Sequence, residues 1–526
     1  MDTDRRAKVE MRHGNSTALE APETPMTGWR VNSGDYLALA LIATSVMVLH
    51  IATDGRYGFH RDELQVLDDA RHLAWGFVAL PPFTPLIERI SMALFGTSLV
   101  GLRLFSVLAQ GAVIILTGLM AREFGAKRLA QIVAALAVAV APVPFFDAVI
   151  SQYSSFDLLW WVLIAYFLIR VLKYGDPHWW VAIGAVAGIG MLTKYTMAFY
   201  VAGFGGALLL TPERRHLRSR WLWYGVALSF LVLLPNLIWE VRHGFISLHF
   251  LQYIHKRDIG EGRTSGFIPH QFLLNSNVML TPLWLAGFFY FSADREGKRY
   301  RVFGWSYVIC VALFLALKGR DYYAAGLYPM LFAGGSVLWD HWVRWLRPGW
   351  ARVVQIATFA AIALGGYGVG RALLPMGPIS SNNYALKVNG ELREEIGWTD
   401  LVAEVARIRE SLPSAERAHL GIITGNYGET GAIDLYGRRY GLPQAISGTN
   451  MAWYRGYGDP PPQTLIVLGL SRSGADKRFR SCRLAGHDGN PYGIENEEST
   501  DHPDIFVCGP PRQPWPEFWG HFQSFG

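Results

Sequence analysis

The chain has 526 residues, of which 51% are hydrophobic and only 17% are charged. These proportions are too apolar for a water-soluble protein of this length and too mixed for a chain that lies wholly in a membrane, so we expect both kinds of region. The net charge of +6 is modest and is explained by basic membrane loops. It does not indicate a nucleic-acid partner.

Residues 1–35 are expected to form a cytoplasmic N-terminal tail. Met1 to Arg30 is polar and carries arginines, and the apolar segment that follows leads to further apolar segments rather than to a small-residue cleavage site. This arrangement is typical of an uncleaved signal anchor. The first apolar segment is therefore interpreted as a membrane span.

Apolar runs recur through residues 36–373. Measured against the ~20 residues that cross a bilayer, they predict a polytopic α-helical membrane domain with about eleven transmembrane helices. The predicted spans are residues 36–53, 100–120, 129–147, 156–172, 178–193, 196–211, 221–239, 276–292, 302–317, 322–339 and 352–371.

Basic residues in the short loops predict the orientation of these spans. With the N-terminus in the cytoplasm, every cytoplasmic loop is basic, whereas the loop at residues 146–155 on the opposite side carries almost no Lys or Arg. Positive charge marks the cytoplasmic side of membrane proteins. An odd number of spans then places the C-terminus outside the cytoplasmic membrane.

Residues 374–526 are expected to form a small extracytoplasmic α/β domain. Apolar density falls there, and short β-type runs at 420–424, 464–468 and 505–507 alternate with helical patterns such as Trp398 to Ser411. The run Gly425 to Asp434 follows the first of these strands. It could offer backbone amides to a ligand, but it lacks a full dinucleotide fingerprint, which favours a structural turn.

Cysteine usage agrees with an exported tail. Cys310 lies in an apolar span and is interpreted as a packing residue. Cys482 and Cys508 both lie in the tail, where the compartment permits disulfides, so we predict that they are bonded to each other.

Two adjacent carboxylates, Asp62 and Glu63, follow the first span. Ionisable groups at a membrane boundary are costly and therefore candidates for function, although a solvated loop that anchors the helix ends is an alternative. The flanking charged or titratable residues are His60, Arg61, Arg71 and His72.

Further polar residues fall on the same predicted side. Asp157 opens the fourth span, where it is either a helix cap or part of a wet cavity. Lys194 follows the fifth span and is either a snorkelling anchor or a ligand contact. A later segment holds two cations and two phenols, typical of either a phosphate clamp or an interfacial belt: Lys318, Arg320, Tyr322 and Tyr323.

The loop from His243 to His270 carries Lys256, Arg257 and Arg263 with Tyr253. It is either a mobile flap or a headgroup contact. Together, these features predict an outward-facing cavity with carboxylates on one side and cations with tyrosines on the other. Such a cavity suits a lipid phosphate that carries a group to be transferred, with a carboxylate to deprotonate an incoming hydroxyl.

Several of these motifs resemble glycosyltransferase family 39, which contains protein O-mannosyltransferases and the aminoarabinose transferases of lipid A. The resemblance covers roughly residues 36 to 340, and the Asp-Glu pair after the first span is its most specific part. The motifs that carry it are Tyr57-Gly-Phe-His-Arg-Asp-Glu-Leu64, Ala70-Arg-His-Leu-Ala-Trp-Gly76 with Pro81-Pro82, Leu192-Thr-Lys-Tyr195, and Lys318 with Tyr322-Tyr323 and Tyr328-Pro329.

The resemblance implies a GT-C type fold, a polyprenyl-phosphate-linked sugar donor and inverting transfer to an envelope acceptor outside the cytoplasmic membrane. By the same resemblance Asp62 is the catalytic base, Glu63 its acidic partner and Asp157 the second acidic position. The expected donor phosphate or headgroup contacts are Arg61, Arg71, His72, Lys194, Lys318, Arg320, Tyr322 and Tyr323.

One position departs from the family pattern. Many relatives carry His or Lys directly before the paired prolines, whereas this chain has Leu80, which can neither ligate a metal nor clamp a phosphate. No cofactor is predicted with certainty, and a divalent metal requirement stays open. The alternatives from other classes are a lipid or sugar transporter or flippase, which is disfavoured because no internal repeat is visible, and a membrane-anchored binding protein.

Overall fold

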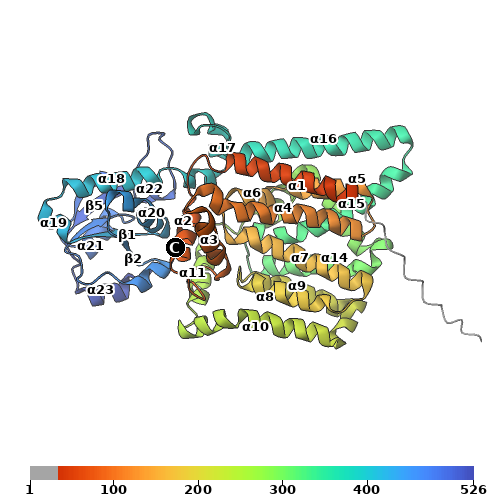
Figure 1. Ribbon diagram of the computed structural model, residues 1–526, viewed down its shortest axis with the longest axis horizontal. Coiled ribbons are helices and arrows are strands. Elements are labelled where there is room, and N and C mark those ends of the chain that lie inside the picture. Colours follow the sequence, from red (N-terminus) through yellow and green to blue (C-terminus); the bar gives the residue numbers. More distant parts are fainter. Residues whose placement is uncertain (1–32) are drawn as a thin grey trace, which may run out of the picture.

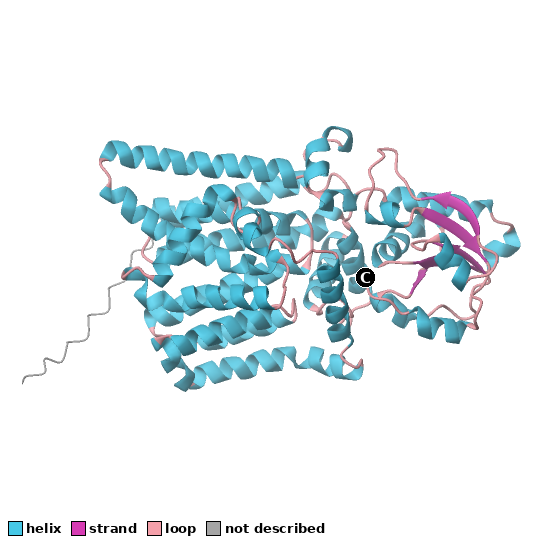
Figure 2. Cartoon of the chain, turned by 180° about the vertical axis from the view of Figure 1, so that it is seen from behind, coloured by secondary structure: helices cyan, strands magenta, loops and turns pink. Residues whose placement is uncertain are grey.

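A computed structural model of the protein describes residues 33–526. A helical domain forms one end of the molecule and a smaller domain with a β-sheet forms the other (Figures 1 and 2). The expected cytoplasmic tail, residues 1–35, lies outside the described residues except for its last three.

The helical domain runs from Ser33 to Leu373. Its helices are α1 (Ser33–Thr53), α2 (Arg61–Arg71), α3 (Phe83–Phe95), α4 (Leu99–Glu123), α5 (Arg128–Ala139), α6 (Pro142–Val149), α7 (Tyr153–Tyr174), α8 (Trp179–Met191), α9 (Met197–Leu210), η1 (Pro212–Arg218), α10 (Arg220–Arg242), α11 (Ile246–Gly260), α12 (Phe267–Leu273), η2 (Val278–Leu280), α13 (Thr281–Ser292), η3 (Glu296–Tyr300), α14 (Arg301–Ala316), η4 (Asp321–Leu327), α15 (Tyr328–Trp345) and α16 (Pro348–Leu373).

Within residues 33–526, six helices are long and apolar enough to cross a membrane, or up to eight if each of two bent helix pairs counts as one span. The expected count of eleven therefore stays a prediction. The range 129–147 forms α5 and α6, which meet at 61°. Pro142 begins α6, and a proline ends the preceding helix because it has no N–H to donate. The two helices α8 and α9 are short apolar segments of 13 and 14 residues.

Glycines allow some of these helices to pack backbone to backbone. A Cβ on Gly184 of α8 would lie 2.0 Å from the carbonyl oxygen of Gly225 on α10. A Cβ on Gly287 of α13 would lie 1.8 Å from the carbonyl oxygen of Leu331 on α15. Small residues at such crossings let membrane helices associate closely, since no side chain separates them.

The C-terminal domain contains a five-stranded mixed sheet of order β2-β1-β3-β5-β4. β1 pairs parallel with β2 and β3, whereas β5 pairs antiparallel with β3 and β4. The elements are η5 (Ile379–Ser381), α17 (Asn383–Val388), η6 (Gly390–Glu395), α18 (Trp398–Ser411), α19 (Ser414–Ala418), β1 (Leu420–Thr424), α20 (Tyr427–Tyr436), η7 (Gly437–Tyr440), β2 (Ala445–Ser447), η8 (Asn450–Arg455), β3 (Thr464–Val467), α21 (Arg472–Arg478), β4 (Arg483–His487), α22 (Glu497–Asp501), β5 (Asp504–Cys508) and α23 (Trp515–Phe522).

The α2 helix belongs to both halves of the molecule. Its buried Leu64 and Leu67 join the same apolar core as Trp398, Ile422 and Ile466 of the C-terminal domain. Figure 1 shows α2 between the bundle and α20. The Asp62-Glu63 pair is therefore carried by the element at which the two domains meet.

Candidate active site

Asp62 lies in the first turn of α2, with its side chain partly accessible. His60 is the N-cap, and its ring accepts a hydrogen bond from the backbone N–H of Asp62. Oδ1 of Asp62 accepts a hydrogen bond from the Tyr427 hydroxyl at 2.9 Å. Among residues 33–526 no other side-chain hydrogen bond or ion pair holds the Asp62 carboxylate, so part of it is available to a substrate.

Glu63 is in a different environment, because its side chain is fully buried. Oε1 accepts from Nε of Arg103 at 2.8 Å and from the backbone N–H of Ser151 at 2.7 Å. Oε2 accepts from Nη2 of Arg103 at 2.7 Å and from the backbone N–H of His60 at 2.8 Å. With four donors around it, this carboxylate joins α2 to α4 and to the turn before α7, and it has a positioning role.

Acidic residues of η6 extend this network. Glu391 accepts from Nε2 of His60 at 3.1 Å, and Glu395 lies 3.5 Å from Nη2 of Arg103. Burial opposes a charge on His60, but the Glu391 hydrogen bond and neighbouring carboxylates together raise the pKa of His60 to about 9. Burial raises the pKa of Glu395 to about 7.

A second cluster surrounds Lys194, in the turn between α8 and α9. Its Nζ lies 4.7 Å from the ring centre of Tyr153, 4.8 Å from that of Tyr322 and 4.4 Å from that of Tyr323. These three rings form a cage whose π faces stabilise the ammonium. Burial lowers the pKa of Lys194 to about 8.

Two buried acids lie close to the cage. Asp157 accepts from Trp161 Nε1 at 3.0 Å and from Thr196 Oγ1 at 3.1 Å, and Asp147 accepts from Ser154 Oγ at 2.6 Å. Of the two alternatives for Asp157, the hydrogen bonds do not support a helix cap, since its partners are side chains and the N-cap of α7 is Gln152. These acids, Lys194 and the two tyrosines of η4 line a cavity of about 20 Å³, which has room for about one water molecule.

Arg320 lies near residues of both clusters. It forms a two-pronged ion pair with Asp258 of α11, with Nε to Oδ2 at 2.6 Å and Nη2 to Oδ1 at 2.8 Å. Its charge acts on Lys194 and on Glu391, and the charge of Asp62 acts on Tyr153. Asp62 and the caged Lys194 thus both lie near Tyr153, although Asp62 lies 132 positions earlier in the chain than Lys194.

The other expected donor contacts have different surroundings. Arg61 pairs with Glu497 at 2.5 Å and lies over the ring of Tyr427. Arg71 donates to the backbone oxygen of Asp434 at 3.2 Å, and the His72 ring bonds the backbone oxygen of Asp68 at 2.9 Å. Arg61 and Arg71 therefore hold α2 on the C-terminal domain, and His72 bonds within its own helix.

Lys318 is exposed, with a positive φ of 49°, and makes no ion pair or side-chain hydrogen bond within the described chain. The segment predicted as a loop from His243 to His270 is largely helical, since it contains α11 and the start of α12, and Asp258 of α11 reaches the polar region through Arg320. Leu80 lies in the segment before α3, where the backbone N–H of Phe83 donates to the carbonyl of Leu192 at 2.9 Å. That bond ties the paired prolines to the segment that carries Lys194.

Sequence reasoning missed Tyr153, Tyr427 and Glu391 as parts of this region. The first two lie inside motifs that the sequence did show, and the glycines beside Tyr427 are the signal that could have found it. A Cβ on Gly428 would lie 2.7 Å from Cγ of Arg61, and one on Gly431 would lie 2.6 Å from the carbonyl oxygen of Leu64. The Gly425–Asp434 run is thus a strand-to-helix turn, as favoured, and its glycines let α20 contact α2.

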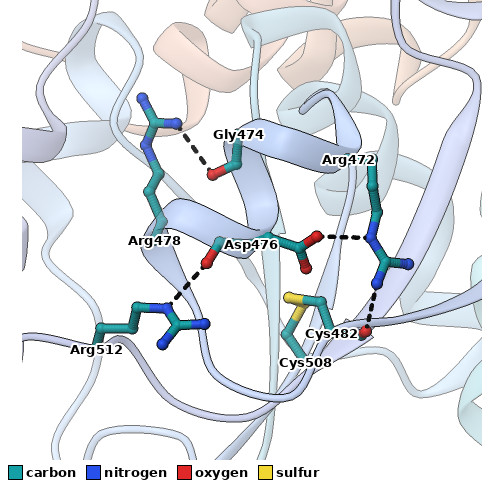
Figure 3. The surroundings of a disulfide bond; sticks show 7 residues. All are labelled: Arg472, Gly474, Asp476, Arg478, Cys482, Cys508 and Arg512. Carbon is teal, nitrogen blue, oxygen red and sulfur yellow. Dashed lines mark hydrogen bonds and ion pairs between the residues drawn. A yellow bond between two sulfur atoms is a disulfide. The ribbon is translucent and has the colours of Figure 1, made fainter.

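The tail cysteines are joined in the structure, whereas Cys310 is a free, buried thiol. The Cys482–Cys508 bond ties the residue before β4 to the end of β5 (Figure 3). Arg472 donates to the carbonyl of Cys482 at 3.0 Å and to Asp476 at 2.8 Å. For residues 33–526, no group of three or more His, Cys, Asp or Glu side chains is arranged to hold a metal ion.

Comparisons with known proteins bear on this arrangement. Residues 79–239 match the family described as dolichyl-phosphate-mannose-protein mannosyltransferase. A lipid A galacturonosyltransferase, RgtD of Rhizobium johnstonii, is 27% identical over 264 residues, which are 48% of this chain and 53% of that protein. The match thus spans about half the length of this curated relative.

Solved structures share the fold over most of the chain. ArnT from Cupriavidus metallidurans bound to undecaprenyl phosphate superposes with a TM-score of 0.55 at 15% identity, covering 90% of this chain and 98% of that one. Its apo form gives a TM-score of 0.51 at 14% identity with the same coverage. The family model and the curated relative agree with the resemblance stated from the sequence motifs, and the likeness to the two ArnT structures shows that this chain shares their fold.

Proposed function

We propose that this protein is an inverting glycosyltransferase that moves a sugar from a polyprenyl-phosphate donor to a hydroxyl of an envelope acceptor, on the extracytoplasmic side of the membrane. The lipid, glycan or protein nature of the acceptor is left open by this proposal. The galacturonosyltransferase relative and the undecaprenyl phosphate bound to ArnT support the donor class.

The main support for the proposal is the environment of Lys194. Its ammonium is held by three tyrosine rings, yet its Nζ makes no hydrogen bond or ion pair with any side chain of residues 33–526. Three N–H donors are therefore available for oxygen atoms of a donor phosphate. The nearby Arg320 adds a fixed positive charge.

The proposed reaction is a single displacement. The acceptor hydroxyl attacks the anomeric carbon while Asp62 takes its proton, and the bond between that carbon and the phosphate oxygen breaks. The electron pair leaves on the polyprenyl phosphate, where Lys194 and Arg320 stabilise the growing negative charge. Attack opposite the leaving phosphate inverts the anomeric configuration.

The remaining expected site residues have supporting roles in this mechanism. Glu63 holds α2 in position against α4, and Asp157 and Asp147 balance the charge of Lys194. We keep Lys318 as an outer contact for the donor headgroup, because it is exposed two residues before Arg320. The cavity of about 20 Å³ is smaller than a phosphate group, so donor binding requires Tyr322 and Tyr323 to move.

Transfer of radiolabelled sugar in isolated membranes tests the proposal. Membranes that contain the wild-type protein are supplied with a panel of undecaprenyl-phosphate sugars, and label is counted in envelope lipids, glycans and proteins. We expect transfer by the wild type and by Asp501→Asn, an exposed control, but not by Asp62→Asn. Equal transfer by Asp62→Asn would contradict the assignment of the base.

A further inference from the structure

A second cavity lies at the other end of the helical domain. It has a volume of about 470 Å³, within the range of small-molecule sites. It is formed by η1, which connects α9 to α10, and by η3 with the start of α14. The N-terminal end of α10 points away from the C-terminal domain (Figure 1), so this cavity is remote from Asp62.

The lining of this cavity has an excess of positive charge. Five of its residues are Lys or Arg and two are Glu. Each acid has a basic neighbour, because Glu213 lies 3.1 Å from Arg215 and 3.2 Å from His216, and Glu296 lies 3.6 Å from His341, although Oε2 of Glu213 makes no hydrogen bond within residues 33–526.

The remaining cations of the lining have no acidic partner. Arg295, Lys298 and Arg299 form no ion pair with any residue from 33 to 526, and Nη1 of Arg301 is buried with no hydrogen-bond partner there. A buried guanidinium nitrogen without an acceptor is costly. Three unpaired cations and one unmatched donor therefore face a space that can hold an anionic group.

The surroundings of the cavity indicate where that anion comes from. Exposed apolar side chains lie near the ends of the helices that η1 and η3 adjoin: Leu209 and Leu210 at the end of α9, Trp223 on α10 and Trp305 on α14. Exposed tryptophans at helix ends are typical of the headgroup level of a bilayer. An anion at this level is most readily the phosphate of a membrane lipid, whose chains would lie along the same apolar surface.

We infer that this cavity binds the phosphate headgroup of an anionic membrane lipid, in the leaflet opposite to Asp62. Lys298, Arg299 and Arg295 supply the charge, and Arg301 supplies the buried donor. The inference does not depend on the glycosyl transfer proposed above. A bound lipid would fix η1 against η3 and so hold α9, α10 and α14 together at this surface.

Native mass spectrometry of the full-length protein tests the inference, with phosphatidylglycerol and phosphatidylcholine as the added lipids. We expect one phosphatidylglycerol to bind in preference to phosphatidylcholine. Lys298→Gln with Arg299→Gln should weaken that binding roughly 30-fold, since each cation near a membrane surface contributes about one kcal/mol. Arg347→Gln with Arg352→Gln removes the same charge at exposed positions beside another loop and should change binding less than about twofold.

Further binding experiments distinguish a lipid phosphate from inorganic phosphate as the ligand. Competition by undecaprenyl phosphate would support the same site, because its headgroup is also a lipid phosphate. Inorganic phosphate binding as tightly as the lipid would overturn the lipid assignment, and so would equal binding of phosphatidylcholine or equal weakening in the control variant. Arg295→Gln alone, expected to weaken binding roughly fivefold, keeps the test decisive if the double variant fails to fold.

Discussion

The hydroxyl of Tyr427 donates a hydrogen bond of 2.9 Å to the Asp62 carboxylate, and the two residues lie in different domains. Tyr427 begins α20 of the C-terminal domain, whereas Asp62 is in the first turn of α2. The guanidinium of Arg61 lies 5.3 Å from the centre of the Tyr427 ring. The C-terminal domain therefore takes part in orienting the proposed base.

The first prediction concerns that base. Asp62→Asn keeps a hydrogen-bond acceptor for Tyr427 but cannot take a proton at neutral pH, so we expect turnover to fall by ~10²–10⁴-fold while the amount of folded protein is maintained. Sugar transfer and size-exclusion chromatography of the same preparation measure the two quantities. Turnover near that of the wild type would exclude Asp62 as the base.

The second prediction separates orientation from chemistry. Tyr427→Phe removes one hydrogen bond to a carboxylate, a contact of about 1.5–3 kcal/mol, so we expect turnover to fall roughly tenfold to a hundredfold. The Michaelis constant for the donor should change little, because Tyr427 does not belong to the Lys194 cage. Tyr492→Phe removes an exposed phenol of the same domain and serves as the control. Loss of activity in both variants would indicate a general effect on the domain.

The third prediction concerns the buried pair of Glu63 and Arg103. Glu63→Ala leaves the Arg103 guanidinium buried and without its main partner, which costs about 3–5 kcal/mol. We expect a lower yield of folded protein and a lower melting temperature in detergent, with Glu495→Ala as an exposed control. Glu63→Gln should cost less activity than Asp62→Asn. An unchanged melting temperature for Glu63→Ala would count against the positioning role.

The fourth prediction is a pH dependence of donor binding. Burial lowers the pKa of Lys194 to about 8, so its charge is present below that pH and is lost as the pH rises through it. The Michaelis constant for the donor should therefore rise above about pH 8 in the wild type. Lys194→Arg stays charged and should lack this alkaline rise, whereas Lys194→Met should bind the donor weakly at every pH.

Lys318 supplies the comparison for that experiment. It is exposed and lies outside the tyrosine cage, so Lys318→Ala should weaken donor use more than acceptor use, but less than Lys194→Met does. A loss that is equal for donor and acceptor would indicate a structural role for either lysine.

The fifth prediction tests the tail and its compartment. The bond between Cys482 and Cys508 spans 26 positions, for which the chain-entropy estimate of stabilisation is about 3–4 kcal/mol. Alkylation after denaturation should label one cysteine, Cys310, without reduction and three with it. Labelling of all three before reduction would mean free thiols and would weaken the case for an exported tail.

The sequence by itself determined the membrane class and several elements of the tail. The structure has the expected helix at 398–411 as α18 and the expected strand at 420–424 as β1. Both could be predicted because hydrophobic periodicity and flanking residues are local properties of the chain. The carboxylate pair was likewise visible, since charged residues stand out against apolar spans. The spacing of residues along the chain did not indicate that Asp62 is accessible, whereas Glu63 is buried and paired with Arg103.

Only the tertiary structure decided which distant residues share the site. Tyr427 reaches Asp62 across 365 positions, and Glu391 reaches His60 across 331. The partners of Arg61 and the cage around Lys194 also come from segments far apart in the chain. Such contacts depend on how α2 docks between two domains and how η4 folds against α7. Hydrophobic periodicity fixes which face of a helix is buried, but it carries no information about which helix will cover that face.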